Sequence, residues 1–524
     1  MILRKILIAN RGEIAVRVVR ACRDLGLGAV AVFSECDRAA RHVRMADEAV
    51  ALGGNAPADS YLRIDRILQA AQVTGADAVH PGYGFLSENP DFARACHEAG
   101  LTFIGPSPDA VARVGSKTTA RQIAASAGVP VVTGTEMSFG PDASVADLAD
   151  AAARIGYPVL IKAVAGGGGK GMRVVTSAEE LQGAIRLARS EAATAFGDSS
   201  VYLERYLQRP RHVEIQILAD HHGNIRPFVE RECSIQRRHQ KVVEESPSPA
   251  VDSALRKRLA DAAVAVAKQA RYTNAGTVEF LVDEDGHFYF LEVNARLQVE
   301  HPVTEMVAGV DLVQWQIRIA RGERLTLSSD DTLTPNGHAI ECRVYAEDPD
   351  LGFLPSPGRI LALRAPHGPG VRDDGWVEPG TEVPIYYDSL LSKVIVWGQD
   401  RAQATARMRR ALREYEISGV HSTVPFSQWL LARAEFVEAR FHTRFLDELL
   451  QQRAGEPFGE AESSLEEVAA VAACLVEASK SALAAKPALA VATVANSPAR
   501  DLDESDLVHE RSWKARARKE SLRR

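Results

Sequence analysis

The sequence predicts a multidomain protein of mixed α/β and α+β class, with a doubly wound α/β domain first and β-rich segments later. Three observations predict it. The chain has 524 residues, which is too long for one hydrophobic core. Residues 1–110 alternate apolar strand patterns with amphipathic helix patterns, whereas beyond residue 204 strand patterns follow one another through short turns. The 46% hydrophobic and 25% charged residues are ordinary for folded domains.

Composition also excludes several classes of protein. A net charge of −7 and a pI of about 6.1 disfavour a general nucleic-acid binder. No apolar run reaches the roughly 18–20 residues that span a bilayer, and the apolar N-terminal stretch is too short for a signal peptide. The six cysteines are scattered without a CxxC pair, so zinc ligation and a disulfide framework are not expected. We therefore expect a cytoplasmic protein that uses neither nucleic acid nor membrane.

The first domain, expected over 1–114, carries the clearest strand and helix alternation. An amphipathic helix pattern covers 12–26. Apolar strand patterns lie at 5–10, 28–34, 76–80 and 101–105. Strands separated by helices predict a parallel, Rossmann-like sheet, which binds ligands beyond the carboxyl ends of its strands. The turns 10–13 and 80–89 lie there, but neither is GxGxxG, so a dinucleotide site is not supported and ordinary βα turns remain the alternative.

A glycine loop marks the next segment, a helix at 116–128 followed by an α/β lid over about 131–204. The loop GGGGKG at 166–171 is no P-loop, because Lys170 is followed by Gly171 and not by Ser or Thr. Apolar strand patterns flank it on both sides. Bare backbone between two strands can close its N–H groups over phosphate oxygens, so we predict a phosphate-binding flap rather than a simple hairpin turn. Lys162 lies in the preceding apolar strand, where an ammonium is costly unless it meets an anion.

Charged residues crowd 229–249 without a helical period. A solvated charge run is one interpretation; a site for phosphate transfer is the other, because cationic donors and acid–base groups converge at such sites. The residues concerned are Glu230, Glu232, Arg237, Arg238, His239, Lys241, Glu244 and Glu245.

The segment 291–305, LEVNARLQVEHPVTE, is the densest in acid, amide and basic side chains. Five of them recur at every second position: Glu292, Asn294, Arg296, Gln298 and Glu300. On an extended segment this spacing places them on one face. Such a face suits a divalent cation and a small planar oxyanion, which a guanidinium can bind bidentately. A charged, solvated edge strand is the alternative.

A hairpin pattern at 276–293, turned at Asp285-Gly286, brings Glu279 beside Glu292 on neighbouring antiparallel strands. Two adjacent carboxylates suit Mg²⁺, whose other positions nucleotide phosphates can fill. Metal carboxylates, lysines, a glycine flap and a basic loop together indicate an ATP-dependent ligase.

The remainder divides into a β-rich domain, expected over 331–450, and a different tail over 451–524. Short strands with Gly and Pro turns fill 338–400, and helical patterns follow to Leu450. In the tail, Ser463 and Glu466 form a capping box for a helix at 465–483, before an Ala/Val/Pro linker. The last fourteen residues contain seven basic ones. This end either docks a partner or is a solvated tail.

Eight motifs, spread in order over about 1–447, resemble those of biotin carboxylase, the ATP-grasp component of biotin-dependent carboxylases. They are IANRGEIAVRVVRAC, HPGYGFLSEN, FIGPS, IKAVAGGGGKGM, RHVEIQ, ECSIQRRHQKVVEESP, EVNARLQVEHPVTE and GHAIECRVYAEDP. The resemblance implies an ATP-grasp domain over 115–330. It also implies a two-stage reaction: bicarbonate and MgATP (or the Mn²⁺ complex) give carboxyphosphate, and the carboxyl group then passes to biotin.

The resemblance implies a role for each matching residue. Glu300 corresponds to the general base, and Arg343 stabilises the biotin enolate, with Tyr83 also at the biotin site. Bicarbonate would be held by Lys241, Arg296, Gln298, Val299 and Glu300, and metal by Glu279, Glu292 and Asn294. The implied ATP contacts are Lys117, Lys162, Gly166, Gly167, Gly168, Gly169, Glu204, Leu207, His212, Gln236, His239 and Leu281.

No Ala-Met-Lys-Met biotin acceptor occurs in the sequence. We therefore expect a separate biotin carboxyl carrier protein and a separate carboxyltransferase, with this chain as a homodimer. The acceptor could be acetyl-CoA (for fatty acid biosynthesis), propionyl-CoA, another acyl-CoA or pyruvate. Two alternatives stay open: another acyl-phosphate-forming ATP-grasp ligase, and a non-catalytic scaffold protein.

Overall fold

The computed structural model describes residues 3–135, 137–164, 171–453, 455–459, 468 and 470–477. By its internal contacts the chain forms two units, residues 1–459 and 460–524. In the second unit, Val468 and residues 470–477 are helical, within the range where a helix is expected. The expected linker and basic end lie outside the described residues.

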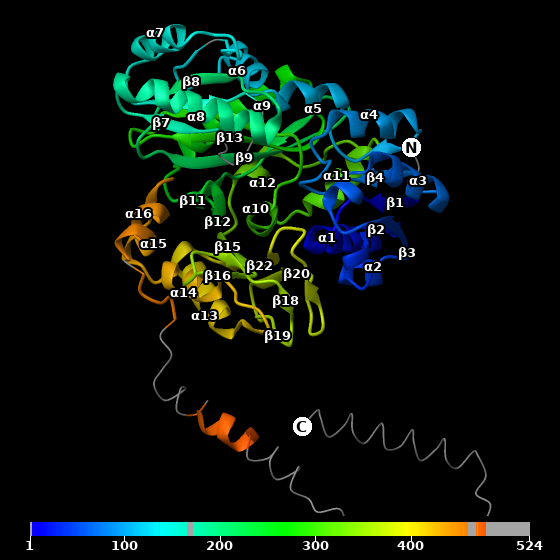
Figure 1. Ribbon diagram of the computed structural model, residues 1–524. Helices are drawn as coiled ribbons and strands as arrows, with labels where there is room; N and C mark the ends of the chain where they lie inside the picture. The colour runs from blue at the N-terminus through cyan, green and yellow to red at the C-terminus, as the bar shows by residue number, and fades with distance from the viewer. Residues whose placement is uncertain are drawn as a thin grey trace, which may run out of the picture. The chain divides into compact units, whose positions relative to one another are not determined.

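Five parallel strands form the N-terminal sheet, in the order β3-β2-β1-β4-β5 (Figure 1). The strands are β1 (Lys5–Ile8), β2 (Gly28–Ser34), β3 (Glu48–Gly53), β4 (Ala78–His80) and β5 (Thr102–Phe103). The helices are α1 (Gly12–Asp24), α2 (Arg41–Met45), α3 (Ile64–Thr74), α4 (Pro90–Glu98) and α5 (Pro108–Gly115). This order confirms the Rossmann-like domain and puts the point of strand-order reversal between β1 and β4. The sequence analysis misses β3, a largely exposed edge strand of small and charged residues.

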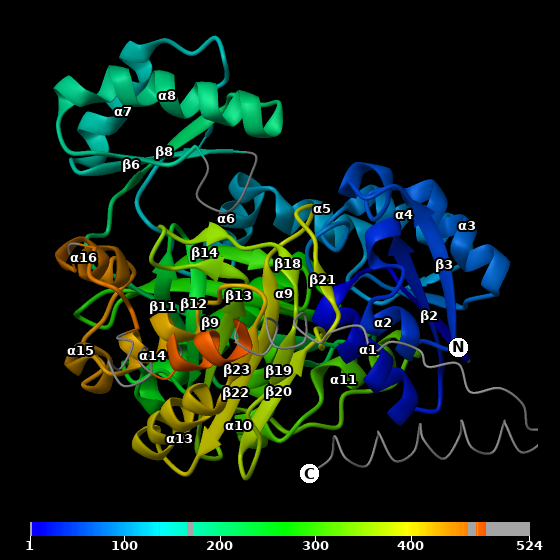
Figure 2. The ribbon, with the colours of Figure 1, turned by 60° about the horizontal axis from the view of Figure 1, so that its bottom comes forward.

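The lid is a three-stranded antiparallel sheet, in the order β7-β6-β8. Its elements are α7 (Val145–Ile155), β6 (Val159–Ala163), β7 (Arg173–Val175), α8 (Ala178–Phe196) and β8 (Val201–Arg205). Figure 2 shows α7 and α8 covering one face of this sheet, while its other face is turned towards β14 of the main body. The glycine loop therefore joins two antiparallel strands, as predicted. Residues 165–170 of the loop lie outside the described residues.

A large antiparallel sheet forms the main body, in the order β14-β13-β9-β11-β12-β15-β22-β20, with β10 beside β9. Its strands are β9 (Arg211–Ala219), β10 (Ile225–Pro227), β11 (Arg231–Arg237), β12 (Gln240–Ser246), β13 (Asn274–Val282), β14 (Phe288–Asn294), β15 (His338–Tyr345), β20 (Val371–Gly375) and β22 (Leu390–Gly398). The predicted hairpin of β13 and β14 is present and pairs Glu279 with Glu292. Strands on both sides of residue 330, where a domain boundary is expected, belong to this one sheet. The division of residues 1–459 into domains stays a prediction.

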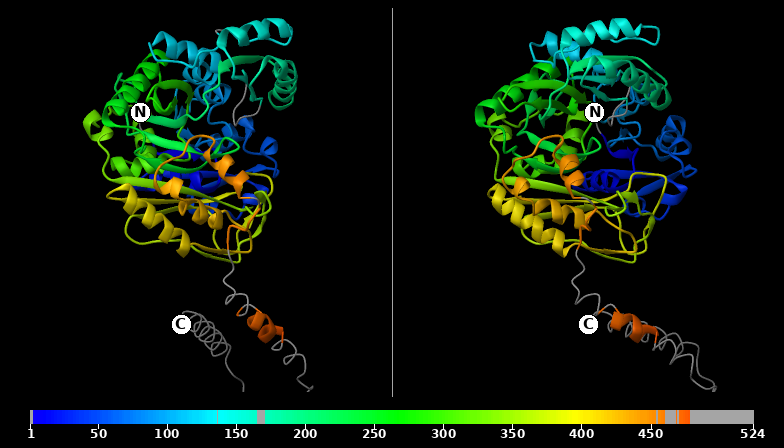
Figure 3. Two further views of the ribbon diagram at one scale, coloured as in Figure 1. Left: turned by 90° about the vertical axis from the view of Figure 1, so that its left-hand side faces the viewer. Right: turned by 60° about the vertical axis from the view of Figure 1, so that its left-hand side comes forward.

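Helices cover this sheet and close its edges. They are α6 (Lys117–Ser126), α9 (Ser253–Ala270), α10 (His301–Ala308), α11 (Leu312–Ala320), α12 (Ser329–Leu333), α13 (Arg401–Glu414), α14 (Val424–Leu431), α15 (Ala434–Val437) and α16 (Phe445–Gln452). Figure 3 shows α13 and α14 (yellow) along the outside of the part that contains β15 and β22, and α13 contacts both strands. No helix among the described residues has both the length and the apolar character needed to cross a membrane.

Alternation along β9 explains where the site forms. Val213, Ile215 and Ile217 are fully buried in the core with α9. The intervening side chains point to the other face, and two of them, Glu214 and Gln216, are also fully buried. A strand with one apolar and one polar face, both buried, places costly polar groups inside the protein, where they must find partners.

Candidate active site

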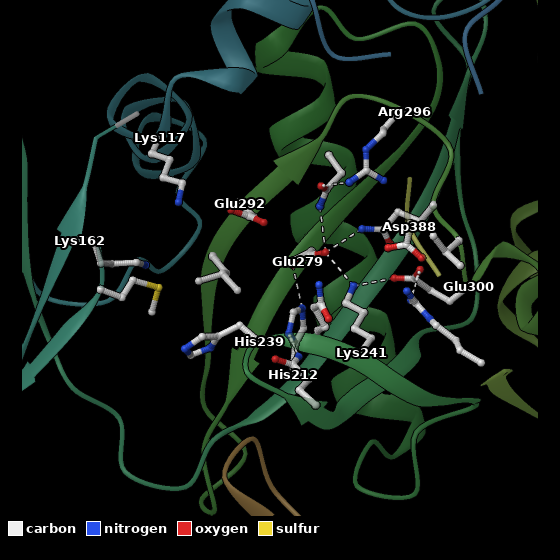
Figure 4. A pocket seen from close by; sticks show the side chains of 18 of the residues that line it. Lys117, Lys162, His212, His239, Lys241, Glu279, Glu292, Arg296, Glu300 and Asp388 are labelled. Carbon is white, nitrogen blue, oxygen red and sulfur yellow. Dashed lines mark hydrogen bonds and ion pairs between the residues drawn. The ribbon is translucent and has the colours of Figure 1, made fainter. Parts of the chain in front are cut away.

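Two adjoining cavities open on the polar face of the large sheet. The first has a volume of about 340 Å³ and the second about 500 Å³. Both are lined by Arg296, Val299, Arg343, Tyr345 and Asp388, which form a shared wall. Figure 4 shows the first cavity, with Lys117 and Lys162 on one side and Arg296 and Glu300 on the other.

Lys241 contacts three carboxylates on the polar face of the large sheet. Its ammonium donates to Glu214 (2.5 Å), Glu279 (3.0 Å) and Glu300 (2.6 Å). Burial would lower the pKa of Lys241, but the three carboxylates outweigh it, so the pKa lies well above its usual value. Lys241 is therefore a permanent cation at the floor of the cavity.

Glu300 accepts from two cations, Lys241 through one oxygen and Arg343 through the other (3.0 Å). Burial would raise the pKa of Glu300, but the charges of Lys241 and Arg343 lower it below its ordinary value. Arg343 is itself held by Glu244, at 2.7 Å from its Nε. The pKa of Glu244 is raised to about 7, chiefly by burial. Glu300 is thus ionised and fixed in orientation before any substrate binds.

Arg296 reaches the cavity from the turn after β14. Its Nε donates to Glu88 (2.9 Å), and one terminal nitrogen donates to Asn294 (3.0 Å). Glu88 also accepts from the backbone of Ala295 (2.9 Å). The loop after β4 therefore orients a guanidinium whose fork suits a planar anion.

The expected metal carboxylates lie side by side on β13 and β14. Glu279 accepts from Lys241, Asn294 (2.9 Å) and Gln298, and it lies 2.8 Å from Nε2 of His212, whereas Glu292 has no hydrogen bond or ion pair among the described residues. Burial, and then the charge of Glu279, raise the pKa of Glu292. A divalent cation would neutralise the negative charge of these two neighbouring carboxylates. The pair of carboxylates therefore fits Mg²⁺ or Mn²⁺.

The opposite wall is less completely paired. Lys162 on β6 donates to Glu204 on β8 (2.9 Å), and Arg121 also contacts Glu204. Lys117, at the start of α6, has no ion pair among the described residues. Burial lowers its pKa. A half-buried ammonium without an ion pair is a binding position for an anion such as phosphate.

The second cavity lies at the strand-order reversal of the N-terminal sheet. The turn after β1 and the loop after β4 both line it, so they are more than ordinary βα turns. Several aromatic side chains line it: Tyr83, Phe85, Tyr345, Trp376, Tyr386 and Tyr387. The hydroxyl of Tyr83 is buried without a hydrogen-bond partner among the described residues. A cavity that combines aromatic rings with polar groups such as Asn10, Arg11 and Arg343 suits a small polar ring such as biotin.

Most residues predicted for the site line the first cavity: Lys117, Lys162, His212, Gln236, His239, Lys241, Glu279, Glu292, Asn294, Arg296, Gln298, Val299, Glu300 and Arg343. Tyr83 lines the second cavity, together with Arg343. Glu204 reaches the site only through Lys162, and Leu207 and Leu281 line neither cavity. Gly166, Gly167, Gly168 and Gly169 lie outside the described residues.

One expectation from the sequence proves wrong in its geometry, and one open alternative is decided. β14 ends at Asn294, and bends and a turn follow, so the five alternating side chains do not share one extended segment. They line the same cavity because the turn folds back onto the sheet. The charged run 229–249, for which a solvated surface was one of two open interpretations, forms β11 and β12 and is largely buried. Glu230 and Glu244 are fully buried, whereas Arg238 and His239, between the two strands, are exposed.

The sequence analysis also misses residues that build the site. Arg231, fully buried, donates to Glu214 (2.5 Å), Gln216 (2.9 Å) and Gln298 (2.9 Å). Glu88 and Asp388 are missed as well. The available signal was the polar series His212, Glu214 and Gln216, which alternates with the apolar side chains of β9.

Comparisons with known proteins agree with this geometry. Family models match residues 2–111 (biotin carboxylase, N-terminal domain), 116–328 (carbamoyl-phosphate synthase L chain, ATP binding domain) and 341–448 (biotin carboxylase C-terminal domain). Biotin carboxylase 1 of Bacillus subtilis is 53% identical over 446 residues, which cover 85% of this chain and 98% of the relative. The chain belongs to the biotin carboxylase family.

Other relatives of this family point the same way. Biotin carboxylase from a Nostoc species is 53% identical over 445 residues, which cover 85% of this chain and 99% of the relative. The biotin carboxylase domain dimer of 2-oxoglutarate carboxylase from Hydrogenobacter thermophilus, solved with MgADP, ADP and bicarbonate, is 47% identical. The match has a TM-score of 0.84 and covers 88% of this chain and 100% of that one. The chain is therefore an ATP-grasp ligase that carboxylates biotin with ATP and bicarbonate.

Proposed function

We propose that the two cavities divide the reaction between them. ATP, its metal and bicarbonate occupy the first cavity, biotin enters the second, and the shared wall separates the two. The observation that carries this proposal is the placement of Arg296, Val299 and Arg343 in both linings. A carboxyl group activated in the first cavity then has a short path to biotin.

Arg296 and Lys241 hold bicarbonate, and Glu300 accepts its proton. A bicarbonate oxygen then bonds to the γ-phosphorus of ATP, the bond to the leaving oxygen of ADP breaks, and carboxyphosphate results. Lys117, Lys162, His212, Gln236 and His239 bind the nucleotide. Mg²⁺ between Glu279 and Glu292 would neutralise phosphate charge. Fixed cations around the reacting oxygens stabilise charge without reorganising.

In the second stage Arg343 stabilises the negative charge that develops on the ureido oxygen of biotin, while Tyr83 orients the ring. The carboxyl carbon forms a bond to N1′, its bond to the phosphate oxygen breaks, and the proton of N1′ passes to the released phosphate. The guanidinium is a permanent donor because its pKa lies well above the usual value, burial being outweighed by Glu244.

The test uses the full-length chain with MgATP, free biotin and labelled bicarbonate. We expect ATP hydrolysis that depends on bicarbonate, and label in an acid-labile product with biotin. ATP hydrolysis indifferent to bicarbonate would contradict the proposal.

We further propose that the enzyme is a cytoplasmic homodimer and serves a separate biotin carboxyl carrier protein and a separate carboxyltransferase. The tail 460–524 lies outside the matched family models and is the segment that docks a partner. Phe458 still packs in the core of residues 1–459, so the informative deletion starts at 460. If that deletion left co-purification of carrier and transferase unchanged, the docking role would be refuted.

A further inference from the structure

A buried ion pair holds the turn that carries the bicarbonate residues; of its two members, Glu13 lines the second cavity and Lys393 lines neither cavity. The ammonium of Lys393 on β22 donates to the carbonyl of Val299 (2.8 Å) and lies 3.2 Å from Glu13 on α1. The side chain of Lys393 is 0% exposed and that of Glu13 is 3% exposed. Segments near residues 13, 299 and 393 thus meet at one ammonium.

The position of Lys393 follows from sheet register. Lys393 lies opposite Arg343 on β15 and opposite Asp374 on β20. Directly opposed residues of antiparallel strands project to the same face. The ammonium therefore emerges beside Arg343, on the side that bears the site.

Neither partner of this pair is placed well for stability alone. A fully buried ammonium loses its hydration and needs close partners in return. Neither oxygen of Glu13 has a hydrogen-bond partner with good geometry among the described residues. Hydrophobic residues of similar volume are often as stable as a buried ion pair. What this pair does, and a hydrophobic replacement could not do, is hold the carbonyl of Val299 in place through a hydrogen bond.

We propose that Lys393, held by Glu13, is a positioning residue for the bicarbonate site. By fixing the Val299 carbonyl it sets the backbone N–H of Val299 and the carboxylate of Glu300, the next residue along the turn. This inference rests on the proposed function, because it concerns the same anion. Lys393 lines neither cavity and touches no substrate position.

Loss of this contact should affect bicarbonate more than ATP. The proposed nucleotide residues lie on α6, β6, β9, β11 and the turn after β11, which the Lys393 contact does not hold. A displacement of about 1 Å at a reacting group can lower a rate about a hundredfold. Loosening the turn should therefore weaken bicarbonate use and leave ATP binding nearly intact.

The experiment measures KM for bicarbonate, KM for ATP and kcat in full-length Lys393→Met, which keeps the apolar stem and removes the ammonium. We expect KM for bicarbonate to rise at least tenfold, with KM for ATP within twofold of wild type. Glu13→Gln, close in shape to the native side chain, should raise KM for bicarbonate less. In the double variant the second change should add little, because both act through one contact.

Arg401→Met is the matched control. Arg401 binds the buried Glu245 at 2.7 Å, and Glu245 follows Glu244 on β12, so it faces away from the site. This control breaks a buried ion pair of the same sheet and should leave KM for bicarbonate unchanged.

The outcomes separate the two proposals. Wild-type ATP hydrolysis without bicarbonate dependence would refute the proposed function. A bicarbonate-dependent wild type, with a bicarbonate KM unchanged in Glu13→Gln and in any folded Lys393→Met, would overturn only the positioning role. Equal rises in the KM for bicarbonate and for ATP, or a rise in Arg401→Met, would also overturn it. If Lys393→Met does not fold, Glu13→Gln decides alone.

Discussion

The two walls of the first cavity are built in opposite ways. On the large sheet, Lys241, Glu300 and Arg343 satisfy one another through hydrogen bonds of 2.6 and 3.0 Å without any ligand. On the facing wall, Lys117 has no ion pair among the described residues, and Lys162 depends on Glu204 of the lid. On the large sheet the bicarbonate residues are paired in the free protein, although the metal carboxylate Glu292 is not. The facing wall is incomplete, because its Lys117 has no ion pair among the described residues.

The difference separates two tasks. Groups that take part in proton transfer must be oriented beforehand, so their partners belong to the rigid sheet. Groups that bind nucleotide gain affinity from the charge that the ligand brings, so an incomplete set of partners favours binding. We expect changes on the first wall to act on turnover and changes on the second wall to act on affinity.

Glu300→Gln should have the largest effect. It keeps the shape of the side chain but cannot accept a proton, and loss of a general base typically lowers rates about 10²–10⁴-fold. Bicarbonate-dependent ATP hydrolysis should fall by that factor, while titration calorimetry shows MgATP binding within a few-fold of wild type. Loss of MgATP binding together with activity would instead assign Glu300 to the nucleotide.

Arg343→Ala comes next and tests the boundary between the two stages. The loss of one charge-stabilising donor costs about 10²–10³-fold, and it should fall on carboxylation of free biotin. MgATP binding should persist. Arg343→Lys serves as the comparison, because an ammonium keeps the charge but lacks the planar fork. Equal damage to MgATP binding and to biotin carboxylation would contradict the assignment of roles.

Lys117→Gln tests the incomplete wall and should act on affinity. Removal of the unpaired ammonium should raise the Kd for MgATP about tenfold, which corresponds to ~1.4 kcal/mol. The KM for bicarbonate should stay near wild type. Lys257→Gln is the control, because Lys257 is 73% exposed and its ion pair with Asp261 lies on the surface. A larger effect on bicarbonate than on nucleotide would remove the distinction between the walls.

The same contrast shows what the sequence alone could predict. The hairpin and the Rossmann-like sheet follow from local patterns, because apolar alternation and the Asp285-Gly286 turn are short-range signals. The pairing of Glu279 with Glu292 was predictable for that reason. The family resemblance supplied roles for Glu300 and Arg343 that no local pattern contains.

What could not be predicted depends on contacts distant in sequence. Glu88 meets Arg296 across 208 residues, and Lys393 meets Val299 across 94. Arg231 lies in the charged run 229–249, for which a solvated surface and a phosphate-transfer site both stayed open, because nothing in the local sequence reveals that the opposite face of β9 is also buried. Tertiary burial of a polar strand face overrides the usual rule that polar residues point outwards.

The smallest expected effect is on the pH dependence of folding stability. It concerns Glu13, which holds Lys393 behind the bicarbonate residues of the large sheet. Burial raises the pKa of Glu13 to about 7 from 4.5, despite the opposing charge of Lys393; Asp374 raises it further and Arg372 lowers it. Between these two pH values the folded state holds a proton that the unfolded state has lost, so stability falls as pH rises. Above pH 7 the loss is complete and amounts to about 3 kcal/mol at most.

Glu13→Gln removes this titration. The melting temperature of the variant, relative to wild type, should therefore increase between pH 5 and pH 8. The gain should be a few degrees at most, because 1 kcal/mol moves Tm by about 2–4 °C even in domains of 150–250 residues. Glu35→Gln, at an exposed carboxylate whose pKa is lowered by Arg38, should show no such increase.

The two measurements on Glu13→Gln can be combined. If the variant is more stable than wild type at pH 8 while its KM for bicarbonate rises, Glu13 positions the bicarbonate site at a cost in stability. A relative Tm that falls with pH would show instead that the ionised pair stabilises the fold, and positioning would no longer be needed to explain it.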